Sequence, residues 1–216
     1  MKIVDGKQEG LWWNAGDKGT RKRKSNEPIQ SIVWHWTAGE GKADAICRSL
    51  KNAKRKVKTK DASGNIVEAL KPRPLSIHFT IDVKGVITQH CDPVTTIAYH
   101  ASAMNSYAIG VEIANSALTK VKNINGRLPR DCIVKGEKRT YYDFLPAQYE
   151  AVKWLASYLS SMYQIPKEVL KENKLYDLSF LKNYRGHLEH LHCSEIKVDS
   201  GGFIMQALEE YFRVVE

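Results

Sequence analysis

The chain has 216 residues, of which 43% are hydrophobic and 26% are charged, a composition typical of globular proteins. It has no run of about 18 apolar residues and no apolar stretch at its start, so we expect neither membrane insertion nor a secretory signal peptide. Its 33 basic and 24 acidic residues give a net charge of +9, which favours an anionic partner such as nucleic acid, a membrane surface or a cell-wall polymer.

The first part of the chain changes its pattern near residue 30. Residues 1–30 lack a sustained hydrophobic period, so we expect a lead-in segment that packs on the rest of the protein. Residues 29–36 are rich in β-branched and aromatic side chains and predict a buried strand that ends at a glycine-containing loop. Residues 42–56 have near-helical apolar spacing and predict a short basic helix. Residues 58–74 contain many turn formers and predict an exposed hairpin or loop.

The central part of the chain predicts two further β elements and a long helix. Residues 76–89 alternate around Lys84-Gly85 and predict a hairpin, and residues 108–114 predict an interior strand. Residues 118–144 are polar and basic, with turn signals, and predict an inserted hairpin or long loop. Pro146 then begins an amphipathic helix that ends before Pro166.

The last part of the chain predicts a small helix over 167–173, a histidine-rich irregular stretch over 184–202 and a closing helix over 203–212. Strands and helices are mixed without strict alternation. We therefore predict an α/β fold, a single domain with a central mixed β-sheet flanked by α-helices. The domain covers residues 31–216, with basic insertions near 51–74 and 118–144.

The residues that could bind a metal or take part in catalysis are concentrated near the C-terminal end. Clustered histidine, cysteine and carboxylate side chains, together with a distant histidine at the end of a strand, are the components of a zinc site. Spacing alone does not separate the candidates, which are His187, His190, His192, Cys193, Glu195 and Asp199. Cys47, Cys91, Cys132 and Cys193 form no CxxC pair, so we interpret all four as reduced thiols.

Glu112 interrupts an otherwise apolar predicted strand. A buried carboxylate without a partner is costly unless its pKa rises or a cation pairs with it. A raised pKa beside a metal-activated water is what a general base requires. The alternative is that Glu112 points outward from an edge strand into solvent.

Four segments in order carry a family pattern. They are Ile32-Val33-Trp34-His35-Trp36-Thr37-Ala38, Ser76-Ile77-His78-Phe79 with Asp82 to Gln89, Ala98-Tyr99-His100-Ala101 through Asn105 to Ile109-Gly110-Val111-Glu112-Ile113, and Gly186-His187 with Lys197-Val198-Asp199. Together they resemble the zinc-dependent N-acetylmuramoyl-L-alanine amidases of type 2. That superfamily includes phage T7-like lysozymes, anhydro-muropeptide amidases and peptidoglycan recognition proteins. The resemblance extends from residue 31 to about residue 205.

The resemblance implies a zinc cleft at the edge of the sheet and a set of metal ligands. His35, at the end of the first core strand, matches the first zinc ligand, and His187 matches the second. Asp199, two positions after Lys197, matches the third. Cys193 is the alternative third ligand, because thiolate binds zinc well but no lysine precedes it by two positions.

The resemblance also implies the chemistry and the substrate. Glu112 is the expected general base, and Lys197 with zinc stabilises the oxyanion. His100 lines the substrate cleft, and Asn105 lies on the loop that shapes it. The scissile bond is the amide between the lactyl group of N-acetylmuramic acid and the L-alanine of the stem peptide.

Charge and size then favour a phage endolysin that binds peptidoglycan, acts as a monomer, and reaches the wall from the host cytoplasm through a holin-opened membrane. Two alternatives stay open, a cytoplasmic amidase that recycles anhydro-muropeptides and a peptidoglycan-binding module without activity. Nucleic-acid binding is not expected, because no recognition motif accompanies the basic runs Arg21 to Lys24 and Lys51 to Lys60.

Overall fold

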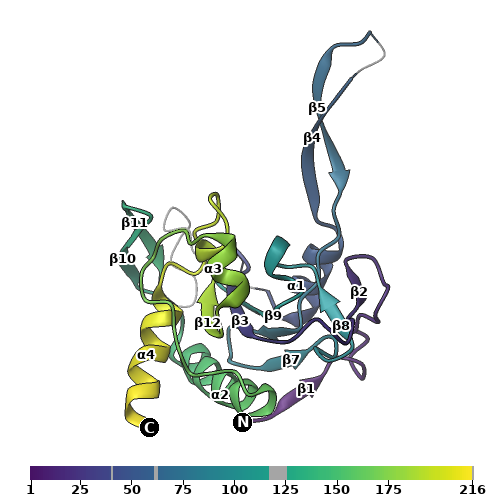
Figure 1. Ribbon diagram of the computed structural model, residues 1–216. Coiled ribbons are helices and arrows are strands. Elements are labelled where there is room, and N and C mark those ends of the chain that lie inside the picture. The colour runs from purple at the N-terminus through teal and green to yellow at the C-terminus, as the bar shows by residue number, and fades with distance from the viewer. Residues whose placement is uncertain (40, 61–62, 117–125, 216) are drawn as a thin grey trace.

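The central sheet of the computed structural model has six strands in the part of the chain that is described, residues 1–39, 41–60, 63–116 and 126–215. Four neighbouring strands are parallel, and the two strands beyond them make the sheet mixed, because β7 is antiparallel to β6 and parallel to β1. The order across the sheet is β1 (Ile3–Asp5), β7 (Ile87–Gln89), β6 (Phe79–Ile81), β9 (Ala108–Ile113), β3 (Ser31–Trp36) and β12 (Gly186–Glu189) (Figure 1). The predicted α/β class with a mixed sheet is confirmed.

Helices cover both faces of this sheet. The long helices α2 (Pro146–Tyr163) and α4 (Phe203–Val215) pack on one face and share the largest apolar cluster with β3, β6, β7 and β9. The other face carries two smaller clusters, to which α3 (Leu178–Asn183) and α1 (Ala43–Lys51) contribute. None of the described helices is both long and apolar enough to cross a membrane.

The alternation of side chains along β3 decides which groups reach the site. Ile32 and Trp34 point to the face covered by α2 and α4, whereas Val33 packs with the cluster of the opposite face. Because successive side chains of a strand point to opposite faces, His35 lies on the same face as Val33. The strand is buried at all six positions, as befits an interior strand of a mostly parallel sheet.

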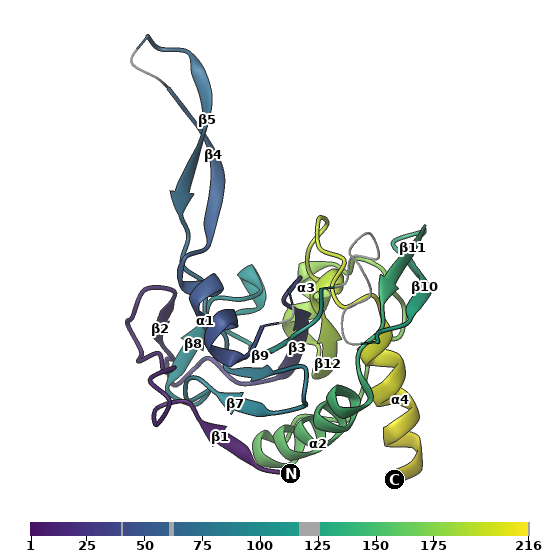
Figure 2. The same ribbon diagram turned by 180° about the vertical axis from the view of Figure 1, so that it is seen from behind.

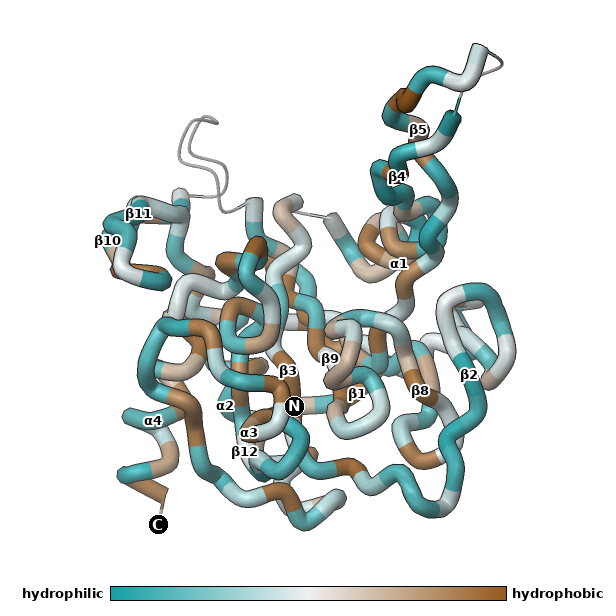
Figure 3. The backbone as a smooth tube through the Cα atoms, turned by 45° about the horizontal axis from the view of Figure 1, so that its top comes forward, coloured by the Kyte–Doolittle hydropathy of each residue, from teal (hydrophilic) through white to brown (hydrophobic). Residues whose placement is uncertain are grey.

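The predicted elements near the first insertion need one correction. The predicted helix over 42–56 ends at Lys51, because Lys54 already begins a strand. That strand, β4 (Lys54–Lys60), pairs antiparallel with β5 (Ile66–Pro72), so the segment predicted as a hairpin or loop is a hairpin. Figures 1 and 2 show that it stands away from the body of the molecule. In Figure 3 most of it is hydrophilic, while the apolar residues gather in the central strands.

The predictions for residues 167–202 also need correction. Residues 167–173 are not helical, because Val169 forms an isolated β-bridge with His187, and the short helix α3 follows later. The segment predicted as irregular contains the edge strand β12 and the short 3-10 helix η2 (His190–His192). All four residues of β12 are buried, so its sequence lacks the alternation that would have revealed a strand.

Shorter elements complete the fold. The N-terminal residues contribute β1 to the central sheet, and β2 (Thr20–Lys22) pairs with β8 (Thr96–Ala98). In the second insertion, β10 (Pro129–Val134) and β11 (Glu137–Tyr142) form a hairpin, while residues 117–125 lie outside the described residues. All four cysteines are free, as predicted.

Candidate metal centre and active site

Three parallel strands bring their carboxyl ends to one edge of the sheet, where α/β proteins usually place ligands. His35 is the second-last residue of β3, and Glu112 lies directly beside it in the register of β9. His190 follows the last residue of β12, which pairs with β3 on its other side. The strand ends therefore gather two imidazoles and a carboxylate from distant parts of the sequence.

Three metal-ligating atoms converge at this edge. His35 Nδ1 lies 3.0 Å from His190 Nδ1, and Asp199 Oδ2 lies 3.1 Å from His190 Nδ1 and 3.4 Å from His35 Nδ1. All three residues are buried, and within the described ranges they form a group that could hold a metal ion. Three such contacts cannot all be hydrogen bonds, because the two imidazole nitrogens supply at most one proton each and the carboxylate supplies none.

A divalent cation fits this donor set. Tetrahedral zinc with bonds of about 2.0–2.1 Å separates its ligand atoms by about 3.3 Å, close to the distances observed here. Two imidazoles and one carboxylate are also a ligand set of catalytic zinc, which keeps a fourth position for water or substrate. Burial, followed by the nearby His190, lowers the pKa of His35 to about 4, so its imidazole is neutral at pH 7, as a metal ligand must be.

The structure does not bring His187 to this cluster, and His190 takes the place that we predicted for it. In the register of β12, His187 pairs with Ile32, so its side chain lies on the face covered by α2. There Ser160 Oγ lies 3.0 Å from His187 Nε2, and Trp34 Nε1 donates to His187 Nδ1 at 3.3 Å. Both ring nitrogens of His187 are thus engaged on the far side of the sheet.

The alternative ligand Cys193 does not point into the cluster either. Its Sγ donates to the carbonyl oxygen of His190 at 3.4 Å, and burial raises the pKa of its thiol to about 12. Asp199 therefore supplies the third ligand atom of the observed group. Burial alone would raise the pKa of Asp199, but hydrogen bonds from His190 and His35 outweigh it and hold that pKa well below its usual range.

His100 and Asn105 fix the orientation of His35. His35 Nε2 lies 3.0 Å from His100 Nδ1, so the ring nitrogen that faces away from the cluster has a partner. Such a partner holds a ligating imidazole in one tautomer. Asn105 Oδ1 in turn accepts from the backbone N–H groups of His100 and Ala101, at 3.0 and 2.7 Å. Burial and then the nearby His35 hold the pKa of His100 well below its usual value.

Glu112 lies near the cluster, and besides burial its pKa is influenced by Asp199 and Lys197 in opposite directions. Burial, followed by the charge of Asp199, raises the pKa of Glu112 to about 8, and the ammonium of Lys197 acts in the opposite direction. Glu112 is buried in the interior strand β9, so the alternative of a solvated edge position does not hold. A carboxyl group with this pKa exchanges protons readily near neutral pH.

A cavity of about 270 Å³ opens above the cluster. His190, His100, Asn105 and Lys197 contribute to its wall, and Arg73, Pro74 and Leu75 form the part below the β4–β5 hairpin. Glu112 lines a second cavity of about 250 Å³, together with the loop that follows β3 and residues of α1. A substrate in the first cavity would reach His190 of the ligand group and the exposed Lys197 at the same time.

Two charged side chains that the sequence did not single out hold the segment that carries Lys197 and Asp199. Lys135 Nζ donates to the carbonyl oxygens of Ser194, Glu195 and Lys197, at 2.5, 2.8 and 2.6 Å. Lys135 and Gly136 form the two-residue turn between β10 and β11, and both have a positive φ, of 53° and 81°. A two-residue turn of this kind usually has asparagine or glycine at its first position, so the lysine there indicates a use for its side chain.

Glu189 holds the segment from its other end. Its carboxylate accepts from four backbone N–H groups, those of Ser200, Gly202, Ile204 and Met205, at 2.7 to 3.3 Å. These groups include the otherwise unpaired N–H donors at the start of α4. Asp199 is therefore flanked by a cation that binds carbonyl groups before it and an anion that binds N–H groups after it.

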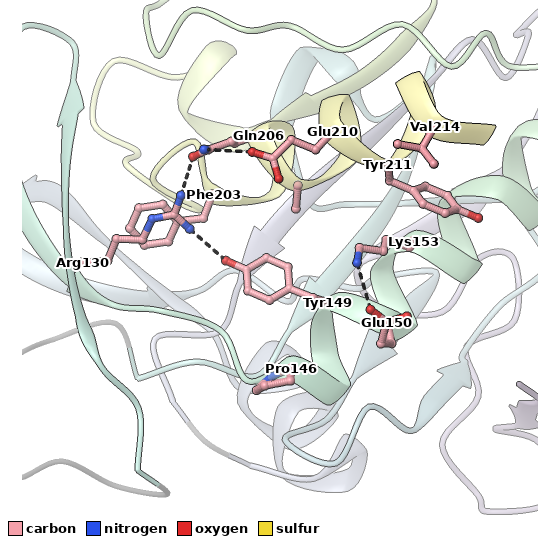
Figure 4. Close-up of a pocket in the computed structure, with 11 residues that line it drawn as sticks. Arg130, Pro146, Tyr149, Glu150, Lys153, Phe203, Gln206, Glu210, Tyr211 and Val214 are labelled. Atoms are coloured by element: carbon pink, nitrogen blue, oxygen red, sulfur yellow. Dashed lines mark hydrogen bonds and ion pairs between the residues drawn. The ribbon is translucent and has the colours of Figure 1, made fainter. Parts of the chain in front are cut away.

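A larger hollow lies elsewhere, between α2, α4 and β10 (Figure 4). It measures about 610 Å³, and its charged residues have hydrogen-bond or ion-pair partners within it. Arg130 contacts Gln206 and, at 3.3 Å, the hydroxyl of Tyr149, and Lys153 pairs with Glu150 at 2.9 Å. It lacks a group of metal ligands, so the smaller cavity above the cluster is the candidate active site.

His190 was within reach of sequence reasoning. It belonged to the candidates near the C-terminal end, and it lies 9 residues before Asp199, whereas His187 lies 12 residues before it. A strand predicted over 186–189 would still not have decided the face of His187, because that face depends on the register with β3. The positions of Lys135 and Glu189 gave no signal, because nothing in the sequence shows which backbone groups they meet.

Comparison with known proteins agrees with this geometry. A profile described as N-acetylmuramoyl-L-alanine amidase matches residues 25–201, most of the chain. A search of curated protein sequences returned no match. Among solved structures, the chain is similar to the Escherichia coli amidase AmiD in complex with an anhydro-N-acetylmuramic acid peptide (TM-score 0.52, 20% identity), covering 89% of this chain and 61% of that one.

Two structures from Clostridium intestinale match over nearly their full length. The chain is similar to the amidase LysC (TM-score 0.52, 16% identity), covering 99% of this chain and 98% of that one. It is also similar to the endolysin LysCS (TM-score 0.53, 15% identity), covering 98% and 95%. At these identities the structures show a shared fold, whereas the profile match identifies the family. The chain belongs to the N-acetylmuramoyl-L-alanine amidase family.

Proposed function

We propose that this protein is a zinc-dependent peptidoglycan amidase that cleaves the bond between N-acetylmuramic acid and the L-alanine of the stem peptide. The observation that carries the proposal is the convergence of His35, His190 and Asp199 at the edge of the sheet, below a cavity lined by Lys197. The family match supports the reaction, and the donor set supports the metal.

Each residue of the site has a distinct task. His35, His190 and Asp199 would hold zinc, which when bound polarises a carbonyl group and lowers the pKa of a water molecule. In its ionised form, Glu112 accepts a proton from the attacking water and returns it to the departing amine of L-alanine, and its raised pKa makes that form a stronger base. The ammonium of Lys197 faces the negative charge that develops on the amide oxygen. His100 keeps His35 in one orientation.

Digestion of purified sacculi tests the reaction. Wild type and Glu112→Gln would be incubated with sacculi, and the released material would be analysed by mass spectrometry. We expect free stem peptides that begin with L-alanine from the wild type and a loss of at least about 10²-fold in Glu112→Gln. Release of disaccharide-peptides would identify a glycosidase and contradict the proposal.

Measuring the metal content of variants shows whether His190 or His187 is the second metal ligand, independently of activity. We expect about one zinc per chain in the wild type, much less in His190→Ala, and a retained ion in His187→Gln. Elemental analysis after gel filtration measures this, with circular dichroism as the check of folding. Retained zinc in His190→Ala together with its loss from His187→Gln would restore our original assignment of the second ligand.

We further propose that the natural substrate is polymeric peptidoglycan, as for a phage endolysin made in the host cytoplasm and released to the wall. The net charge of +9 and the endolysin LysCS among the similar structures support this choice. A recycling amidase would instead prefer soluble anhydro-muropeptides, and a recognition protein would bind without turnover. Comparing kcat/KM on sacculi and on anhydro-muropeptide distinguishes the three functions.

A further inference from the structure

The β4–β5 hairpin concentrates the charge of the molecule. Residues 51–73 contain eight basic and two acidic residues, so they supply +6 of the formal net charge of +9. The hairpin extends from the body as a two-stranded arm (Figures 1 and 2). We call residues 54–60 and 66–72 the basic arm.

The pairing of the two strands places four of the six cations of the basic arm on one face, whereas Arg55 and Lys71 lie on the other. Lys54, Lys56, Lys58 and Lys60 occupy alternate positions of β4, so their side chains point to the same face. All four are exposed, and Lys56 pairs with Glu68 across the hairpin at 2.9 Å. Alternate residues of a strand are about 6.7 Å apart, so the four ammonium groups form a row of roughly 20 Å.

The root of the arm is part of the candidate active site. Arg73, Pro74 and Leu75 line the cavity above the metal-ligand group. The root is fixed to the end of α1, because the backbone N–H of Arg73 donates to Ala53 at 2.8 Å and that of Leu75 donates to Leu50 at 3.0 Å. A polymer that enters the cavity therefore passes the root of the basic arm.

The composition of the arm selects among anionic partners. Residues 51–73 contain six lysines, two arginines and no aromatic residue. Proteins bind single-stranded nucleic acids with aromatic side chains that stack on the bases. Segments that lie at a membrane interface are enriched in tryptophan and tyrosine. Arginine is preferred for bidentate binding of phosphate, whereas lysine acts as a mobile point charge. A row of lysines without aromatics fits carboxylates on flexible chains.

We propose that the basic arm binds the carboxylate-bearing stem peptides of polymeric peptidoglycan that neighbour the one in the cleft. This inference rests on the proposed function and deepens it, because it names the part of the substrate that lies outside the site. The arm raises the affinity for the polymer and leaves the turnover of a single muropeptide unchanged.

The experiment compares two charge-matched variants in an inactive and an active background. In the arm variant, Lys54, Lys56, Lys58 and Lys60 are replaced by glutamine. In the control variant, the same change is made at exposed lysines elsewhere, namely Lys2, Lys22, Lys84 and Lys182. Sedimentation with sacculi freed of phosphodiester polymers, in the Glu112→Gln background, measures binding. Turnover of a soluble monomeric muropeptide is measured in the active background.

We expect the arm variant to bind stripped sacculi about tenfold more weakly than the control variant at low salt, with the difference largely lost near 1 M salt. Muropeptide turnover should be equal in both. Equal binding of the two variants to stripped sacculi would overturn the proposal. So would a defect seen only with wall material that keeps its phosphodiesters, or only with vesicles of anionic phospholipid. Absence of stem-peptide release from sacculi by the wild type would instead refute the proposed function. The binding measurement, made in the inactive background, does not depend on that release.

Discussion

Two hairpins of this protein, each with more basic than acidic residues, lie in opposite environments. The basic arm, β4–β5, stands away from the body and exposes its lysines. The β10–β11 hairpin lies against the body, with Tyr141 packed on Trp36 at 4.8 Å between ring centroids and with Val134 fully buried. Lys135, at the turn of the β10–β11 hairpin, donates to three carbonyl groups of the segment that carries Lys197 and Asp199.

This difference separates two uses of positive charge. Ammonium groups on the arm act at a distance, and salt screens them over about 10 Å at ordinary ionic strength. The ammonium of Lys135 acts through short hydrogen bonds in a partly buried place, where screening is weak and geometry is fixed. Charge on the arm should therefore control binding of the polymer, whereas charge at the β10–β11 turn should control the site itself.

Among the variants that test this difference between the hairpins, Lys135→Met has the largest expected effect. Without its three hydrogen bonds, the segment that carries Lys197 and Asp199 loosens, so kcat/KM on soluble muropeptide should fall by about 10–10²-fold and zinc affinity should fall as well. Lys138→Met in the same hairpin is the control, because Lys138 is exposed and pairs with Asp131 of its own hairpin at 2.8 Å. Equal activities of the two variants would show that the charge of Lys135 does not control the site, and would contradict the distinction between the two uses of charge.

Glu189→Gln tests the anionic side of the same arrangement. The carboxylate accepts from four backbone N–H groups, and a glutamine places an amide NH₂ where only acceptors fit. We expect the free energy of unfolding to fall by about 2–3 kcal/mol. Urea unfolding measures this loss. A value within experimental error of the wild type would show that the start of α4 and the segment before it need no such acceptor.

Glu112→Gln tests how much a buried negative charge at this position destabilises the folded protein. The raised pKa of Glu112 sets the direction in which stability changes with pH. The folded protein holds a proton on Glu112 up to about pH 8, whereas the unfolded chain releases it near 4.5, so stability falls as pH rises through this window. With the metal removed by a chelator, the variant should be more stable than the wild type at pH 9, by about 1–3 kcal/mol, and nearly equal at pH 4. Unfolding curves at both pH values would decide this, and a constant difference between them would contradict it.

The smallest expected effect on stability is that of shortening the basic arm. Replacement of residues 55–71 by a short glycine-serine turn removes few buried groups, because most side chains of β4 and β5 are exposed. We expect the free energy of unfolding to change by less than about 1 kcal/mol. Thermal unfolding of the shortened protein checks this, and a large loss would mean that the arm belongs to the fold.

The sequence by itself determined the elements whose pattern is local. The buried strand at His35, the interior strand at Glu112 and the helix between Pro146 and Pro166 were predicted from hydrophobic period and helix boundaries, and the structure confirms them. The family resemblance likewise came from short segments whose order along the chain is visible without the structure.

Only the tertiary structure decided which residues share the site. The edge strand β12 is four residues long and buried on both faces, so no alternation marks it, and the face on which His187 or His190 lies depends on its register with β3. Lys135 is one cation among many in the sequence, and its role follows from the three carbonyl groups that the fold brings to it. Hydrophobic periodicity depends on residues that are close together in the sequence. Strand register and the partners of a charged side chain depend on contacts between segments that are far apart in the sequence.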